Sequence, residues 1–179
     1  ADGLGRMAAR LMAEAGHEVV LHARSKARAD EALAAVPGAK SAIAGDLASI
    51  EQCRRIAAEV NGLGAFDAVI HNAAVGDRER RRIATVDGLS QVFAINTLAP
   101  YVLTALIGKP KRLVYLSSGM HRGADSTLEH LNWEHRPWNG SDAYADSKLH
   151  DAILAFAVAR KWPDVLSNAV DPGWVATKM

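Results

Sequence analysis

The sequence predicts an α/β protein in which helices cover both faces of a doubly wound parallel sheet. Short apolar segments that suit buried strands alternate along the chain with longer segments of helical periodicity. The strand segments are apolar throughout rather than at every second residue, which is typical of parallel strands covered on both faces. With 179 residues, 49% of them hydrophobic, the chain can bury one core but not two ordinary domains. We therefore expect a single domain over 1–179.

Each element is predicted by a local pattern. Apolar residues recur at helical spacing over 4–15, and Gly16 then provides a C-terminal stop. An Ala-rich helix ends at Pro37-Gly38, and the last helix is closed by Pro163. The predicted order is helix 4–15, strand 18–22, helix 26–36, strand 39–44, helix 49–60, strand 68–71, helix 86–107, strand 112–117, helix 142–162 and strand 165–170.

The segment 119–141 is longer than a usual connection, so we expect it to have a function. It contains Trp133 and Trp138. These rings form either a wall over the substrate or an ordinary packing of the loop onto the core, and the sequence favours neither.

Composition excludes several classes of protein. Lys and Arg number 21 against 20 Asp and Glu, a net charge of +1, so no overall field attracts nucleic acid or an anionic membrane. The basic run 78–82 is interpreted as a solvated loop. No segment has the ~20 consecutive apolar residues of a membrane span, and the histidines lack metal-ligand spacing. We therefore expect no metal. The single Cys53 indicates a reducing compartment, so we expect a cytoplasmic protein.

Two glycines, Gly3 and Gly5, precede the first helix, where N–H groups and close backbone approach suit a pyrophosphate. A tight turn is the alternative. In a doubly wound sheet such a loop follows a strand at the centre of the sheet. We therefore expect the domain over 1–179 to lack its first strand, and C-terminal elements as well.

Tyr144 and Lys148 lie at i and i+4, on one face of a predicted helix. Ser117-Ser118 and Asn72-Ala73-Ala74 each follow a predicted strand, and Asn96 lies in the helix between them. In this order the residues resemble the short-chain dehydrogenase/reductase family. The 26 positions from Ser118 to Tyr144 are a longer insertion that resembles its retinol-dehydrogenase-like and protochlorophyllide-reductase-like branches.

The resemblance implies a Rossmann fold with three α/β/α layers and an NADP-binding site. Asn96, Ser118, Tyr144 and Lys148 match the catalytic tetrad of the family. The residues that match its nucleotide-binding motifs are Gly3, Leu4, Gly5, Asp46, Leu47, Asn72, Ala73, Ala74, Pro172, Gly173, Val175 and Thr177, together with Tyr144 and Lys148. Ala74 departs from the glycine that usually ends the third of these motifs.

The chemistry explains the choice of residues. A free tyrosine has a pKa of about 10 and is a poor base, and a nearby ammonium lowers that value. Tyr144 is the predicted acid/base, Lys148 tunes it and contacts the nicotinamide ribose, and Ser118 binds the substrate oxygen. Pro100 lacks an N–H, so it leaves the Asn96 carbonyl free for a proton-relay water or simply kinks the helix.

The cofactor is predicted to be NADP(H). At the end of the second strand, Ala23 replaces the acid that NAD enzymes use, and Arg24 follows with a guanidinium suited to a phosphate. Asp2 in the glycine loop argues mildly against this choice. An Arg24 that is merely solvated is the alternative.

The sequence thus predicts an oxidoreductase that transfers hydride between NADP(H) and a small or medium apolar carbonyl or alcohol. The alternative is a non-catalytic NADP(H)-binding regulatory protein of the same fold. The resemblance also implies a homo-oligomer built on the helices that carry Asn96 and Tyr144.

Overall fold

The computed structural model describes residues 3–76, 78–173 and 175. Its strands are β1 Val20–Ala23, β2 Ser41–Ala44, β3 Ala68–His71, β4 Arg112–Leu116 and β5 Leu166–Val170. Its helices are α1 Gly3–Glu14, α2 Lys26–Ala35, α3 Ile50–Gly62, α4 Gln91–Phe93, the π-helix η1 Ala94–Leu98, α5 Ala99–Leu106, the 3-10 helix η2 Gly119–Gly123 and α6 Gly140–Lys161. Strands and helices alternate as the sequence predicts.

All strand pairs are parallel. β1 pairs with β2, and β3, β4 and β5 pair in that order, so that His71 lies opposite Tyr115 and Leu116 opposite Val170. An apolar cavity of about 540 Å³ lies between the two sets of strands, lined by residues of both β1 and β3. The predicted α/β class with a doubly wound parallel sheet is confirmed.

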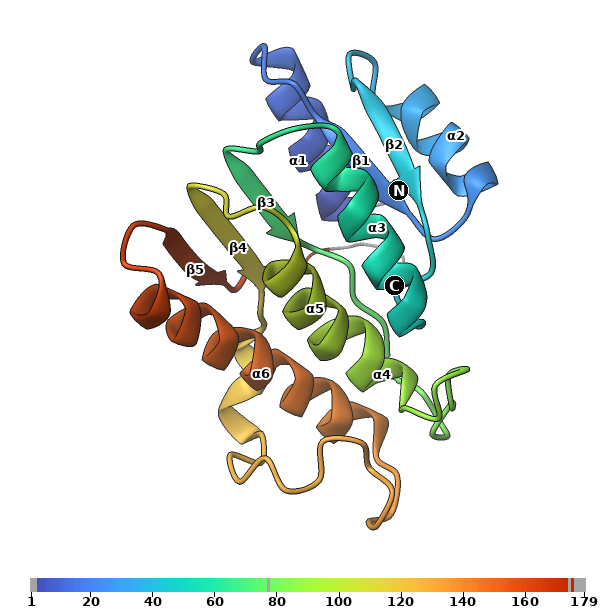
Figure 1. The fold of residues 1–179 in the computed structure, drawn as a ribbon. Coiled ribbons are helices and arrows are strands. Elements are labelled where there is room, and N and C mark those ends of the chain that lie inside the picture. Colours follow the sequence, from blue (N-terminus) through green and yellow to red (C-terminus); the bar gives the residue numbers. More distant parts are fainter. Residues whose placement is uncertain (1–2, 77, 174, 176–179) are drawn as a thin grey trace.

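Helices pack against the strands and bury apolar side chains between them. α2 packs on β1 and β2, while α3, α5 and α6 lie side by side across one face, with α6 covering β4 and β5 (Figure 1). One core cluster joins Ile43, Ile56 and Leu103, and a second joins Tyr115 and Val158. Among the described residues, no helix combines the length and apolar character needed to cross a bilayer.

Cys53 belongs to the first core cluster and is 1% exposed. Its thiol lies 3.7 Å from the carbonyl oxygen of Leu47, and burial raises the pKa of the thiol to about 11. The side chain is therefore an inert core residue rather than a nucleophile.

The helix expected over 86–107 begins later than predicted. A turn precedes it, in which Gly88 has φ +75° and its N–H donates to the carbonyl of Thr85. Val86 is 87% exposed in this turn, so its side chain faces solvent and is not part of a buried helix face. The helix proper starts at Gln91 and passes through the π turn Ala94–Leu98, because local turn chemistry overrides the apolar pattern.

Candidate active site

A cavity of about 820 Å³ lies at the carboxyl ends of the strands, where open α/β sheets bind ligands. Most residues that the sequence predicted to form the site line it. These are Gly3, Leu4, Arg24, Asp46, Leu47, Asn72, Ala73, Ala74, Ser118, Tyr144, Lys148, Pro172, Gly173 and Val175. The fold therefore brings together residues that are up to 172 positions apart in the sequence, from Gly3 to Val175.

The start of α1 forms one wall of this cavity. Gly3 has φ +68°, a conformation that glycine adopts without strain. Gly5 does not line this cavity, because it packs against the turn after β3: a Cβ on Gly5 would lie 2.6 Å from the side-chain amide nitrogen of Asn72. Gly5 thus allows the helix to approach Asn72 closely.

Two guanidinium groups follow β1 and reach the cavity. Arg24 lines the cavity, and so does Arg28 from the first turn of α2, which the sequence reasoning missed. Arg28 Nη1 also forms an ion pair with Glu31 at 2.6 Å. Its position in the first turn of α2, just after the strand end that carries Arg24, was the available signal.

The proposed acid/base pair is buried at the opposite side. Tyr144 is 7% exposed and Lys148 2%, and the Lys148 Nζ lies 5.6 Å from the centre of the Tyr144 ring. The helix begins at Gly140 because Asn139 caps it, with its side-chain oxygen accepting from the N–H groups of Ser141 and Asp142. Lys148 Nζ donates to the carbonyl of Leu116 and to Asp151, a contact that was not predicted.

The two serines after β4 differ in environment. Ser117 is buried and donates to the backbone carbonyl of Lys148 at 2.7 Å, which ties the strand to α6. Ser118 caps η2 by accepting from the N–H of Met120 at 3.3 Å. His121 Nδ1 lies 2.5 Å from the carbonyl oxygen of Ser118 and must donate to it, because a carbonyl only accepts.

Asn96 lies behind the cavity wall rather than in it. It is 1% exposed, its Oδ1 accepts from the N–H of Val75 at 2.9 Å, and its Nδ2 donates to the carbonyl of Val75 and to Ser147 Oγ. It also lies within the π turn. The side chain therefore connects the turn after β3 with α6, at the residue between Tyr144 and Lys148.

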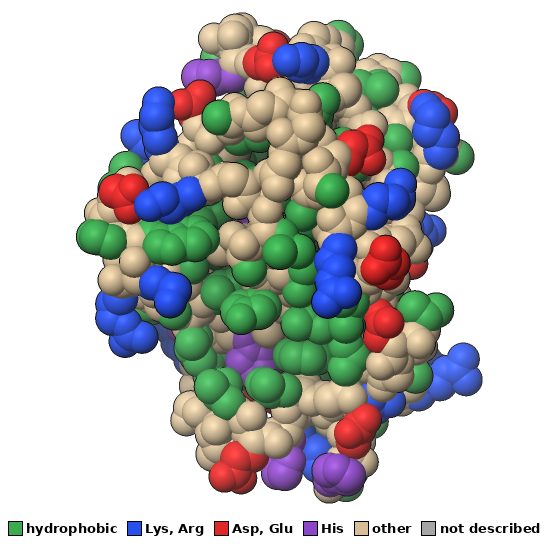
Figure 2. Space-filling view, viewed as in Figure 1, with side chains coloured by type: hydrophobic (Ala, Val, Ile, Leu, Met, Phe, Trp, Pro, Cys, Tyr) green, Lys and Arg blue, Asp and Glu red, His purple; other side chains and the backbone are tan. Residues whose placement is uncertain are grey.

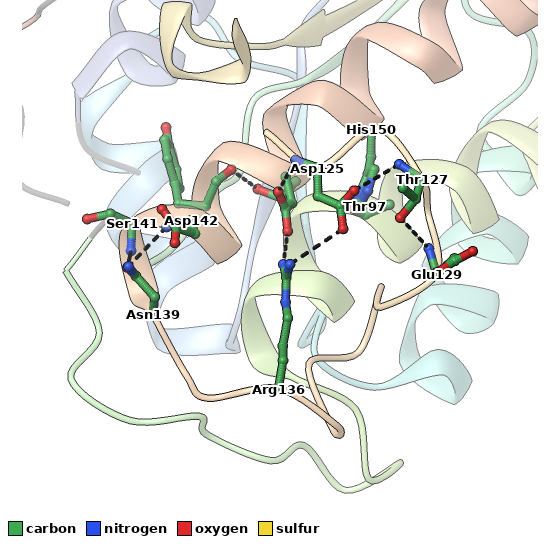
Figure 3. Close-up of polar contacts among 12 residues, drawn as sticks. Thr97, Asp125, Thr127, Glu129, Arg136, Asn139, Ser141, Asp142 and His150 are labelled. Atoms are coloured by element: carbon green, nitrogen blue, oxygen red, sulfur yellow. Dashed lines mark hydrogen bonds and ion pairs between the residues drawn. The ribbon is translucent and has the colours of Figure 1, made fainter. Parts of the chain in front are cut away.

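The long segment 119–141 is fastened to α6 by charge. Arg136 forms ion pairs with Asp146 and, at 3.5 Å, with Asp125 (Figure 3), and the Asp125 N–H donates to Asp146 at 2.9 Å. The guanidinium also stacks 3.3 Å from the centre of the Trp133 ring. Trp133 is 5% exposed in a small core cluster, and neither it nor Trp138 lines the cavity, so the packing alternative describes these rings.

A buried polar chain runs behind the site. His71 Nε2 lies 3.1 Å from Thr104 Oγ1, which lies 2.7 Å from the Tyr115 hydroxyl. Burial lowers the pKa of His71 to about 4 and raises that of Tyr115 to about 12. Both side chains are therefore neutral at physiological pH, which their position in the core requires.

Two residues that the sequence analysis singled out, Thr177 and Asp2, lie outside the described residues. Within the described part of the chain, no three His, Cys, Asp or Glu side chains gather as a metal site would require. The cavity is completed by residues without a motif of their own, such as Gln91, Ile95 and Met120. Only the fold could have identified these, since none carries a distinctive spacing.

The chain is similar in sequence to several known proteins. The family profile described as enoyl-(acyl carrier protein) reductase matches residues 1–179. An uncharacterized oxidoreductase of Emericella nidulans is 46% identical over 99% of this chain and 68% of its own length. Retinol dehydrogenase 13 of Homo sapiens is 28% identical over 99% of this chain and 57% of its own length, in keeping with the predicted branch.

Two solved structures extend the comparison. An uncharacterized protein from Mycobacterium paratuberculosis has a TM-score of 0.87 at 27% identity, over 96% of this chain and 64% of that one. A protein described as an NAD(P)-dependent gluconate 5-dehydrogenase from Beutenbergia cavernae, with bound NADP, has a TM-score of 0.71 at 26% identity, over 98% and 70%. The profile match over the whole chain, together with these relatives, shows that the chain belongs to the short-chain dehydrogenase/reductase family.

Proposed function

We propose that this protein transfers hydride between NADP(H) and a carbonyl or alcohol substrate. The observation that carries the proposal is the joint position of Ser118, Tyr144 and Lys148 on the cavity that Gly3 also lines. A proton donor, an oxyanion partner and a phosphate-binding helix N-terminus then face one space.

The residues present fit a dinucleotide. The cavity volume of about 820 Å³ lies in the usual range for ligand pockets, about 300–1,000 Å³. Gly3 leaves the start of α1 open for a pyrophosphate, and Asp46 with Leu47 would contact the adenine. Asn72, Ala73 and Ala74 would line the middle, and Pro172, Gly173, Val175 and Thr177 the nicotinamide end.

The side chains of the chain itself handle the proton. Tyr144 Oη would give a proton to the substrate oxygen in reduction and take it back in oxidation. Ser118 Oγ would donate a hydrogen bond to the same oxygen, and Lys148 would contact the ribose and favour the phenolate. Asn96 would fix the turn after β3 against α6. A nicotinamide held by these residues would supply or accept the hydride when bound.

NADP(H) is favoured over NAD(H) by charge. Arg24 and Arg28 both line the cavity near the end of β1, where the adenosine ribose would lie, and Ala23 replaces the carboxylate that would repel a 2'-phosphate at that position. The bound NADP in the Beutenbergia cavernae protein is compatible with this preference.

The test is a screen of aldehydes, ketones and alcohols with NADP(H), in which turnover is monitored by nicotinamide absorbance. We expect turnover, and a loss of at least about a hundredfold in kcat for Tyr144→Phe, because general acid–base catalysis contributes ~10²–10⁴-fold. NADPH affinity should persist in this variant. NADPH binding without turnover of any substrate would instead favour the non-catalytic regulatory alternative.

We also propose a homo-oligomer that buries the outer face of α5 and α6. Apolar side chains are exposed on the face of the molecule that Figure 2 shows. Tyr101 of α5 is 57% exposed and Phe156 of α6 is 70% exposed. Size-exclusion chromatography with light scattering should show Phe156→Glu at a smaller mass than the unmodified protein. Equal masses, both of a monomer, would contradict this.

A cytoplasmic location is proposed as well, supported by the unpaired, buried Cys53.

The domain boundary is a further proposal. A parallel strand between β1 and β3 would fill the apolar cavity and join the two sheets, since both edges face it. If residues 1–179 alone unfold in one cooperative thermal transition and bind NADPH, a further strand is not needed.

A further inference from the structure

The amine of Lys148 makes two contacts that its place in the family motif does not explain. Nζ donates to the carbonyl oxygen of Leu116 at 2.6 Å and to Oδ2 of Asp151 at 2.8 Å. Asp151 lies one helical turn further along α6, and the two side chains are only 3% and 4% exposed. A buried ammonium needs acceptors and a counter-charge, and Asp151 supplies both.

The contacts limit what Lys148 can still bind. An ammonium has three N–H donors, and the Leu116 carbonyl and Asp151 occupy two of them. Within the described part of the chain no third acceptor is recorded for Nζ, so one N–H remains for a group in the cavity. Because β4 and α6 fix the other two, the remaining donor is placed by the framework of the fold.

Among the described residues, Lys148 is the charged group that acts on buried Asp151. Tyr115 of β4 is the titratable group across from it, and His71 of β3 stacks on that ring at 4.9 Å. The sequences of β5 and η1 contain neither acids nor bases. η2 carries His121 and Arg122, but neither contributes to the electrostatics of Asp151.

One oxygen of this carboxylate is unsatisfied. Asp151 Oδ1 is buried without a hydrogen-bond partner among the described residues. Burial raises the pKa of Asp151 to about 6, although Lys148 acts in the opposite direction. The counter-charge of Lys148 therefore disappears in mild acid, where an exposed aspartate would keep it.

We propose that Asp151 is a positioning residue for the reaction: its carboxylate holds the Lys148 ammonium at the Leu116 carbonyl and leaves one N–H for the nucleotide ribose. The inference rests on the proposed hydride transfer. Protonation of Asp151 releases Lys148, so nucleotide affinity and turnover decrease together below about pH 6.

The decisive variant is Asp151→Asn, which keeps an acceptor oxygen at nearly the same place and removes the charge. We expect the pH profile of kcat/KM of the unmodified protein to show an inflection near pH 6 that Asp151→Asn lacks. At pH 8 the variant should show the lowered kcat/KM and weaker NADPH binding that the unmodified protein shows below about pH 6, because the amide, like the protonated carboxyl, lacks the negative charge that holds Lys148. The matched control is Asp67→Asn, which removes the exposed partner of Lys111 and should leave the profile unchanged.

Asp151→Leu removes the acceptor as well, and its kcat should decrease about tenfold or more at every pH. If this variant fails to fold, the titration of NADPH fluorescence between pH 5 and 8 decides. The Kd of the unmodified protein should rise below pH 6 more steeply than that of Asp151→Asn. Equal pH dependence of the two, or unchanged kcat in a folded Asp151→Leu, overturns the proposal.

The two hypotheses can be told apart. An unmodified protein that reduces no carbonyl, or a Tyr144→Phe variant that retains full activity, refutes the proposed function. The NADPH titration needs no turnover, so it still decides whether Asp151 positions Lys148.

Discussion

The side-chain amide of Asn96 lies 3.0 Å from the hydroxyl oxygen of Ser147, so the π turn η1 is hydrogen-bonded to the residue between Tyr144 and Lys148. Ser147 in turn donates to the backbone carbonyl of Tyr144 at 2.7 Å. Any change in the π turn should therefore be transmitted to the proposed acid/base pair.

Pro100→Ala restores a backbone N–H just after this turn. If the free carbonyl of Asn96 binds a proton-relay water, the new donor competes for that carbonyl. We expect kcat to fall about tenfold, within the range of proton-transfer effects, and the basic limb of the pH–rate profile to move. Pre-steady-state and steady-state rates over pH 6–10 check this. An unchanged kcat and profile would leave Pro100 with the structural role of shaping the helix.

Removing Arg24 should alter cofactor choice. A hydrogen bond to a charged group contributes about 1.5–3 kcal/mol, so Arg24→Ala should lower kcat/KM for NADPH at least about tenfold and leave NADH unaffected. Arg28→Ala should act in the same direction, since both guanidinium groups line the cavity. Arg10→Ala, which removes an exposed ion pair with Glu14, is the control. A preference for NADH in the unmodified protein would refute the NADP assignment.

Arg136 should stabilise the segment 119–141 against α6. Arg136→Met leaves the nearly buried carboxylate of Asp146 unpaired, so the free energy of unfolding should fall by about 2–4 kcal/mol. In a chain of this size that corresponds to a decrease of roughly 5–15 °C in Tm. KM for the carbonyl substrate should also rise, because Met120 at the start of the segment lines the cavity.

Differential scanning fluorimetry and substrate titrations measure both effects. Asp125→Asn is the comparison, since its contact with Arg136 is the longer one at 3.5 Å and its loss should cost less. Equal Tm values for the Arg136→Met variant and the unmodified protein would show that the ion pair contributes no stability.

His71 should make the protein sensitive to acid. Its pKa in the fold, about 4, lies below the value of 6.5 for an exposed histidine. The unfolded chain therefore binds a proton first as the pH falls, and stability present above pH 6.5 is lost between pH 6.5 and 4. His71→Gln should lose about 2 kcal/mol less between pH 7 and 5, at 1.36 kcal/mol per unit. Parallel curves of unfolding free energy against pH for the two proteins would contradict this.

Much of the fold was determined by local sequence. Apolar runs predicted the positions of the strands, and the spacing of Tyr144 and Lys148 predicted that both lie on one face of a helix. The order of the motifs along the chain indicated the family, which the comparisons confirm. The strand and helix patterns depend on residues within one or two turns of each other, and the motif order depends only on position along the chain, so both can be recognised without knowing how elements pack.

Other features were decided only by the tertiary structure. Whether Lys148 pairs with Asp151 depends on the desolvation that β4 imposes on both, and the spacing of i and i+3 alone does not reveal it. The contact of Asn96 with Ser147 spans 51 positions, and the chain from His71 through Thr104 to Tyr115 joins three separate elements. Burial and long-range hydrogen bonding depend on the relative placement of elements, because one residue's neighbours in space are set by the whole packed core.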